Sequence, residues 1–223
     1  MPFIERAPLR TMRASATAVA IVLGVAACNH DITTPLPPGV QPIGEDGTTP
    51  PDARDGDPYP EDMHLEGRSR DDLTIAVGNG FVHGDLATVW KAFSTPEVVA
   101  DRGADELSFR RDTEPAYQVS FVVHNVVHDV ITVSWDVTWR EIASKGTREA
   151  PEEVRVRWQK TEGTGFIDTY EGSVGLFPVA PNVTRVELVQ RIEAHGQTVD
   201  ETLSGSRSLY DRVVAAVHKT PAP

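Results

Sequence analysis

Residues 131–140 read Ile-Thr-Val-Ser-Trp-Asp-Val-Thr-Trp-Arg, so that every second residue from Ile131 to Trp139 is apolar. Strict alternation is typical of a strand with one buried face, because successive side chains point to opposite faces. The same period of two recurs on either side of this stretch. It is carried by Tyr117, Val119, Phe121 and Val123, by Val154, Val156 and Trp158, by Phe166, Tyr170, Val174 and Leu176, and by Val186, Leu188 and Ile192. The pattern predicts an antiparallel sheet with one covered face.

Helical patterns precede and follow these strands. Residues 73–82 are expected to form a first strand, after which Asp85 is a suitable N-cap for a short helix over residues 86–93. Thr95-Pro96 starts a second short helix, predicted to run to about Arg102. The C-terminal region carries an apolar stripe at helical spacing, made of Leu203, Tyr210, Val213, Val214 and Val217. The sequence therefore predicts an α+β domain in which a six- to seven-stranded antiparallel sheet wraps around the long C-terminal helix.

The first 28 residues resemble a bacterial lipoprotein signal. Three arginines lie within the first 13 residues, residues 14–27 are small or apolar with two exceptions, and the stretch ends Leu-Gly-Val-Ala-Ala-Cys at Cys28. Such an order is typical of a secretory signal rather than of a membrane span. The ending is similar to a lipobox, whose cysteine thiol is lipidated, and Cys28 is the only cysteine. We expect residues 1–27 to be the signal peptide and Cys28 to carry the acyl chains, palmitate among them.

The lipobox resemblance also implies a location and a partner. The implied partner is a membrane, to which the N-terminal lipid anchor attaches the protein. The implied location is the bacterial cell envelope. Asn29 stands where an aspartate retains such lipoproteins at the inner membrane. This favours an outer membrane, facing the periplasm or the cell surface, in a cell that has one.

Residues 31–62 are rich in proline and glycine, with Pro-Pro pairs at 37–38 and 50–51. Such a segment has little apolar surface of its own to offset the entropy lost on ordering. We therefore expect residues 28–70 to comprise the lipidated N-terminus and a disordered, semi-stiff tether. Residues 71–223 show no further break in composition and are predicted to form one domain.

The predicted order of elements is similar to the helix-grip fold of the START-like (SRPBCC) superfamily. Three stretches carry the resemblance: residues 85–97 for the first helix and following loop, and residues 172–179 and 183–188 for the late hairpin. The resemblance implies a cavity between sheet and C-terminal helix that binds lipids or other apolar molecules. It equally allows a polyketide cyclase- or hydratase-like enzyme, or a protein-interaction domain with a filled core, so whether the chain is an enzyme stays open.

Candidate site residues follow from the strand parities and from this implied cavity. The apolar candidates for its lining are Phe121, Trp135, Trp139, Trp158, Phe166, Tyr170, Leu188, Tyr210 and Val214. The polar candidates, which share parities with apolar residues, are Asp168, Gln190 and Asn125. Inward-facing polar groups need partners and so often mark a site, although strand ends near water give the same pattern. Asp168 with Tyr170 is the one acid–base group that an enzyme could use here.

Composition and motifs exclude or disfavour several further classes of function and site. The formal net charge of −12 disfavours nucleic-acid binding, because a polyanion repels phosphate backbones. A single cysteine excludes an intrachain disulfide and four-cysteine zinc sites. His124 and His128 have a metal-ligand spacing only on a helix, whereas this region reads as strand, so we expect no metal and no cofactor.

Overall fold

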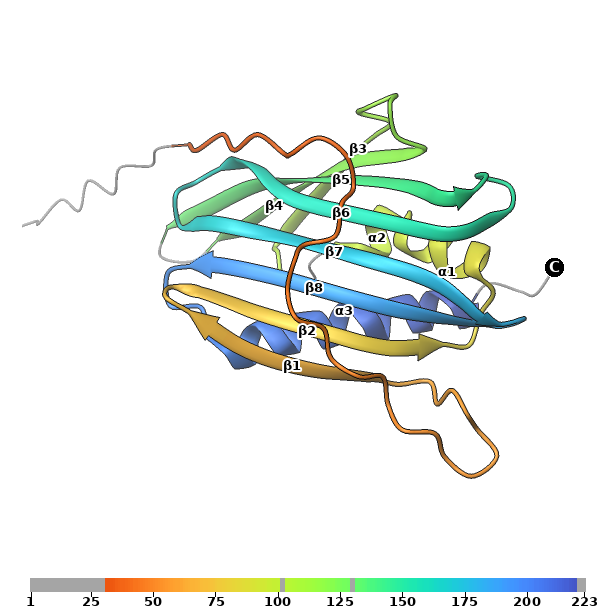
Figure 1. Cartoon of the computed structure of the whole chain (residues 1–223). Helices are drawn as coiled ribbons and strands as arrows, with labels where there is room; N and C mark the ends of the chain where they lie inside the picture. The colour runs from red at the N-terminus through yellow and green to blue at the C-terminus, as the bar shows by residue number, and fades with distance from the viewer. Residues whose placement is uncertain (1–30, 101–102, 129–130, 220–223) are drawn as a thin grey trace, which may run out of the picture.

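One eight-stranded antiparallel sheet organises the protein (Figure 1). The computed structural model describes residues 31–100, 103–128 and 131–219. Across the sheet the strand order is β1-β2-β8-β7-β6-β5-β4-β3. The strands are β1 (Met63–Arg70), β2 (Leu73–Val82), β3 (Glu106–Arg111), β4 (Val119–His128), β5 (Thr132–Gly146), β6 (Pro151–Gly163), β7 (Ile167–Ala180) and β8 (Val183–Ala194).

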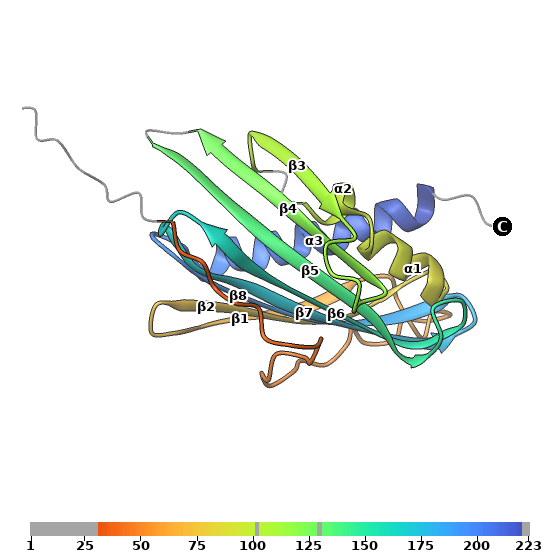
Figure 2. The same cartoon turned by 90° about the horizontal axis from the view of Figure 1, so that it is seen from above.

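The helices cover the concave face of this curved sheet (Figure 2). They are α1 (Leu86–Phe93), α2 (Pro96–Val99) and α3 (Val199–Lys219). Asp85 caps α1 as predicted, its carboxylate accepting from the Thr88 backbone N–H at 2.8 Å. α3 packs against β1, β2 and β8 and against both short helices. The predicted helix-grip fold is therefore confirmed.

Two details differ from the sequence-based prediction. The sheet has eight strands rather than six or seven, because β1 and β3 form its two edges. Edge strands bury few side chains, so the alternation is short in these two strands, with Met63 and Leu65 in β1 and Leu107 and Phe109 in β3. α2 ends at Val99, where Ala100 adopts an extended backbone, whereas Arg102 lies outside the described residues.

A stack of three aromatic rings forms the centre of the core. Phe121, Trp139 and Trp158 lie on adjacent strands with ring centroids 5.6 and 4.6 Å apart and nearly parallel planes. Trp158 lies flat across Gly172 of β7, where an added Cβ would approach the indole to 1.9 Å. The alternation in residues 131–140 and 154–158 correctly predicts that Trp135, Trp139 and Trp158 are buried on the helix side of the sheet.

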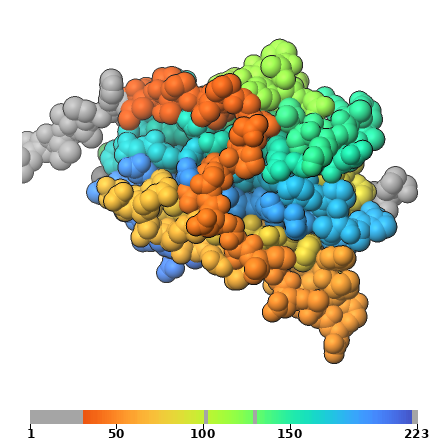
Figure 3. Space-filling view, viewed as in Figure 1, coloured from red at the N-terminus to blue at the C-terminus, as the bar shows by residue number. Residues whose placement is uncertain are grey.

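Residues 31–62, here named the strap, cross the convex face of the sheet (Figures 1 and 3). The Ile32 N–H donates to the Gly163 carbonyl at 2.8 Å, and the Gly39 N–H donates to the Tyr117 hydroxyl at 2.9 Å. Val40 and Ile43 are buried against the sheet. The prediction of a disordered tether is wrong for this segment, and residues 63–70 form β1 instead.

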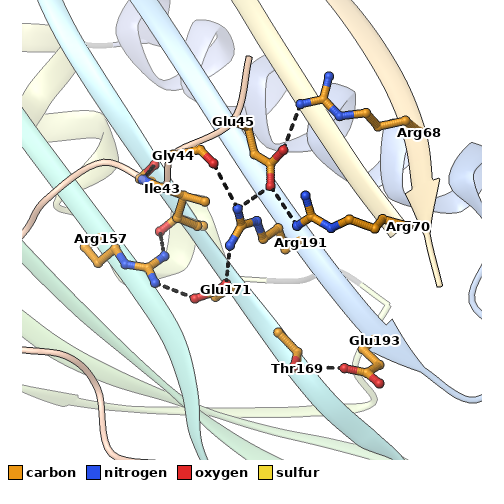
Figure 4. A network of polar contacts seen from close by, with 12 residues as sticks. Ile43, Gly44, Glu45, Arg68, Arg70, Arg157, Thr169, Glu171, Arg191 and Glu193 are labelled. Carbon is orange, nitrogen blue, oxygen red and sulfur yellow. Dashed lines mark hydrogen bonds and ion pairs between the residues drawn. The ribbon is translucent and has the colours of Figure 1, made fainter. Parts of the chain in front are cut away.

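A network of ion pairs fixes the strap over β8 and β1 (Figure 4). The Glu45 carboxylate accepts from Arg191, from Arg68 at 2.9 Å and from Arg70 at 3.2 Å. Burial alone would raise the pKa of Glu45, but hydrogen bonds from Arg68 and Arg191 hold it below its ordinary value. The strap lacks a core of its own, and it is ordered because the sheet supplies the apolar surface and the cations that it needs.

Candidate functional site

A cavity of about 230 Å³ lies between the concave face of the sheet and α2, and we name it the central cavity. Its wall is mainly apolar and comes from β4, β5, β7 and β8, from α2, and from the turn after β8. The lining residues are Val99, Ala100, Val123, Asn125, Trp135, Val137, Trp139, Ile167, Tyr170, Ile192, Ala194 and Gln197.

A second hollow of about 480 Å³ lies beneath α3, next to the central cavity. The two share Val99, Tyr170, Ile192 and Gln197 in their walls, so they are adjacent. From α3 the second hollow receives Glu201, Gly205, Ser208, Leu209 and Arg212, and from the sheet it receives Gln190. An apolar wall with a few converging polar groups is the usual composition of a small-molecule pocket.

The structure brings five of the predicted site residues together on this wall. Trp135, Trp139, Tyr170 and Asn125 line the central cavity, and Gln190 lines the adjacent hollow. Phe121, Trp158 and Leu188 are fully buried in the core instead, as neighbours of the cavity wall rather than parts of it.

The predicted residues of α3 are also packing residues. Tyr210 donates its hydroxyl to the Phe81 carbonyl at 2.6 Å, and burial raises the pKa of this phenol above its ordinary value. Val214 packs against the hydrophobic core without lining either hollow.

Phe166 and Asp168 do not line the central cavity. Asp168 therefore does not share a site with Tyr170, which does line it. The ladder between β7 and β8 has an irregularity between Ile167 and Thr169, so Asp168 has no ladder partner and its parity differs from that of Tyr170. Asp168 is exposed, and Phe166 is 38% exposed in the turn before β7. A parity count along residues 166–176 cannot detect such a bulge. The expected acid–base group of Asp168 and Tyr170 is therefore not assembled.

Asn125 is the polar group best placed to orient a ligand. It is 2% exposed, and its amide nitrogen donates to the carbonyls of Val123 at 3.2 Å and Trp135 at 3.3 Å. These two bonds fix the plane of the amide and leave its oxygen able to accept a hydrogen bond from a ligand. Gln190 is held differently, since its carbonyl accepts from the Ser206 hydroxyl of α3 at 3.4 Å.

Glu141 is a buried carboxyl group that the sequence analysis missed. It continues the inward parity of Trp135 and Trp139, and it is completely buried beneath α1. One carboxyl oxygen accepts from the Trp90 indole and from the Ser94 hydroxyl, each at 2.6 Å, while the other has no partner. Burial raises the pKa of Glu141 to about 7, against the two hydrogen bonds that favour the charged form. Glu141 therefore ties α1 to β5 and does not line the cavity.

Lys160 is a second buried ionisable group, at the turn between β6 and β7. Its ammonium donates to the carbonyls of Thr164 and Ile167, and burial lowers its pKa against the charges of Asp168 and Asp31. Lys160 thereby closes the turn that carries Phe166.

The two histidines at metal-ligand spacing each contact a different carboxylate. His124 lies 2.6 Å from the Asp136 carboxylate, and His128 lies 2.8 Å from that of Glu106. Across the described ranges, no three histidine, cysteine or acidic side chains converge as metal ligands would. No helix in the part of the chain that the structure describes is long and apolar enough to cross a bilayer.

Comparisons with known proteins concern the architecture. No family model and no curated protein sequence matches this chain. Among solved structures, the lipid transfer and protein localization domain of human StarD13 is 11% identical, with 74% of this chain and 87% of that one covered at a TM-score of 0.49. The Zhui aromatase/cyclase from Streptomyces sp. R1128 is 12% identical, covering 65% and 91% at a TM-score of 0.40. Norcoclaurine synthase from Thalictrum flavum is 13% identical, covering 72% and 98% at a TM-score of 0.44. These neighbours are helix-grip folds of the START and Bet v 1 kind.

Proposed function

We propose that this protein is a bacterial envelope lipoprotein whose helix-grip domain binds an apolar small molecule or a lipid. The observation that supports binding is the apolar central cavity, which Trp135 and Trp139 line and which a second hollow beneath α3 adjoins. Burying apolar ligand surface supplies the affinity, and the Asn125 amide oxygen supplies an orienting hydrogen bond.

The polar groups on the wall favour binding over catalysis. Among the described residues, the ionisable side chains that line the two hollows are Tyr170, Glu201 and Arg212. The Glu201 carboxylate accepts from the backbone and hydroxyl of Thr198 near the start of α3. The Arg212 guanidinium donates to the Val98 carbonyl at 2.8 Å. Both of these groups hold local structure, whereas a general acid or base must reach the substrate.

The binding proposal is tested by native mass spectrometry of the full chain purified from its own host, followed by titration of an apolar fluorescent fatty acid. We expect a retained apolar ligand and saturable binding of the probe. Ala194→Trp fills the cavity from β8 and should weaken probe binding strongly. Glu187→Trp, on the opposite face of the same strand, is the size-matched control and should bind as the wild type does. Equal binding by both variants, or no binding by the wild type, would refute the proposal.

The lipid anchor is supported by the lipobox-like ending at Cys28, which lies outside the described residues. Cys28→Ser should abolish incorporation of a labelled fatty acid in the native host and leave the signal peptide unprocessed. Equal labelling of this variant and the wild type would rule out Cys28 as the anchor.

A further inference from the structure

The first described residues are fixed at one particular end of the sheet. Asp31 forms an isolated bridge with Thr164, and the Ile32 N–H donates to the Gly163 carbonyl at 2.8 Å. Thr34 continues this pairing with a bond to the Thr161 carbonyl at 2.9 Å. The strap therefore begins beside the turn between β6 and β7, as Figure 1 shows in red.

Very little chain separates this point from the proposed anchor. Cys28 precedes Asp31 by three residues. A fully extended chain spans at most about 3.6 Å per residue, so Cys28 lies within roughly 11 Å of Asp31. Because the strap is docked, it cannot act as a long spacer. A lipid on Cys28 would hold this end of the domain at the bilayer surface.

The same end carries the exposed large apolar side chains of the described residues. They are Ile131 and Phe166, each 38% exposed. Ile131 immediately precedes β5, and the Ser134 carbonyl of β5 accepts from the Thr164 N–H at 2.9 Å. Ile131, Phe166 and the first strap residue thus belong to neighbouring turns at one end of the sheet.

A surface depression at this end adjoins the central cavity. A depression around Phe166 is lined by residues from the β1–β2, β6–β7 and β8–α3 connections. Two of its residues, Ala194 and Gln197, also line the central cavity. A ligand that enters from this end therefore passes between Phe166 and the turn after β8.

The acidic charge at this end of the sheet indicates which kind of lipid surface the domain can contact. Four acidic residues line the depression, namely Asp71, Asp72, Asp168 and Glu193. Carboxylates at a bilayer surface are repelled by anionic headgroups and tolerated by zwitterionic ones, whose net charge is zero.

We propose that the domain rests on a net-neutral bilayer through Ile131 and Phe166, with the mouth of its cavity facing the lipid. The proposal deepens the function proposed above, because it rests on an anchor at Cys28 and on an apolar ligand. Its consequence is that a ligand exchanges between cavity and bilayer directly.

The test replaces the natural anchor with a synthetic one. The chain from Cys28 to Pro223, which keeps every described residue, is coupled through its only thiol to a maleimide lipid in phosphatidylcholine vesicles. Hydrogen exchange is then compared with that of the uncoupled chain. Burying a large apolar side chain changes an equilibrium constant about tenfold, so exchange at residues 163–168 should slow by about that factor. Residues 146–151 and 180–183, at the opposite end, should be unaffected. Equal protection at both ends, or none at residues 163–168, would overturn the proposal.

Two pairs of variants sharpen this test. Phe166→Asp should remove most of the protection, whereas Thr147→Asp at the opposite end should retain it. A flexible Gly/Ser insertion of about 20 residues after Asn29 should release the domain from the surface. The same insertion in the exposed turn between Arg54 and Asp57 leaves the short connection intact and should preserve protection. If Phe166→Asp leaves protection at residues 163–168 as high as Thr147→Asp does, the proposed contact of Phe166 with the bilayer is wrong.

Lipid composition tests the charge argument separately. Replacing part of the phosphatidylcholine with anionic phosphatidylglycerol should reduce protection, and increased protection would refute a preference for neutral lipid. Since the anchor is synthetic, a failure here leaves lipidation at Cys28 untouched. Conversely, a failure of fatty acid labelling in the host would leave the surface contact measured here intact.

Discussion

Replacing Glu141 with glutamine should change how the stability of the protein depends on pH. Glu141 is fully buried, and its pKa is raised from 4.5 to about 7 by burial. A carboxyl whose pKa is higher in the folded state stabilises the fold while it is protonated, and this stability is lost as pH rises through the folded-state pKa. The shift corresponds to about 3 kcal/mol, of which about 2 kcal/mol is lost between pH 5.5 and 8.5.

Glutamine reproduces the protonated carboxyl without titrating. Its carbonyl can accept from Trp90 and Ser94, and its NH₂ takes the position of the oxygen that has no partner. Urea unfolding, followed by tryptophan fluorescence, measures the free energy of unfolding at each pH. Relative to the wild type, Glu141→Gln should gain about 2 kcal/mol between pH 5.5 and 8.5.

Glu153→Gln provides the control for this measurement. The Lys145 ammonium, with help from Ser144 and Arg155 and against burial, lowers the pKa of Glu153 to about 2. Its contribution to stability is therefore present above pH 4.5 and is lost only in more acidic solution. Between pH 5.5 and 8.5 the difference between this variant and the wild type should stay constant. A constant difference for Glu141→Gln as well would refute the assignment of a buried, titrating carboxyl.

Four further substitutions test the core, the cavity and the strap, by urea unfolding for the three in the core and cavity wall and by limited proteolysis for the one in the strap. Gly172→Ala should destabilise the protein by about 1–3 kcal/mol, because the added Cβ would overlap the Trp158 indole. A variant as stable as the wild type would contradict the described packing of that ring. Trp158→Ala should cost about 3–5 kcal/mol, whereas Trp135→Ala, whose ring borders the open cavity, should cost less and weaken binding of the fatty acid probe. Ile43→Ser should expose the strap to limited proteolysis while β2 to α3 stay resistant, and an unchanged digestion pattern would argue against apolar docking of the strap.

The sequence predicts the centre of the sheet well because burial there is one-sided and regular. In β5 and β6 the positions of Trp139 and Trp158 follow from alternation, and the two are ladder partners. The short helix after β2 is equally clear, since Asp85 caps it and its apolar residues recur at helical spacing. Local rules suffice for these elements because each residue's environment is set by its immediate neighbours.

The errors arise where distant parts of the chain decide the structure. The strap has no periodicity of its own, and its ordering depends on arginines such as Arg191 that follow it by more than a hundred residues. Asp168 was assigned to the wrong face because a bulge changes the parity of β7. Glu141 continues a buried parity that is otherwise apolar, and its partner Trp90 lies on α1, 51 residues earlier in the chain. Patterns within one segment do not contain this information.

The position of the strap has a consequence for the order in which the protein folds. Thr74 of β2 and its neighbour Ile192 of β8 are 118 residues apart along the chain, and Ile43 is 130 residues from Ser173. Closing such long loops is entropically costly, so contacts of this kind form slowly. β2 comes early in the chain, whereas β8, which pairs with it, is the last strand. Until β8 pairs with it, β2 presents an unpaired edge to other chains. Refolding should therefore be slow, and aggregation during refolding should rise with protein concentration until β8 has paired with β2.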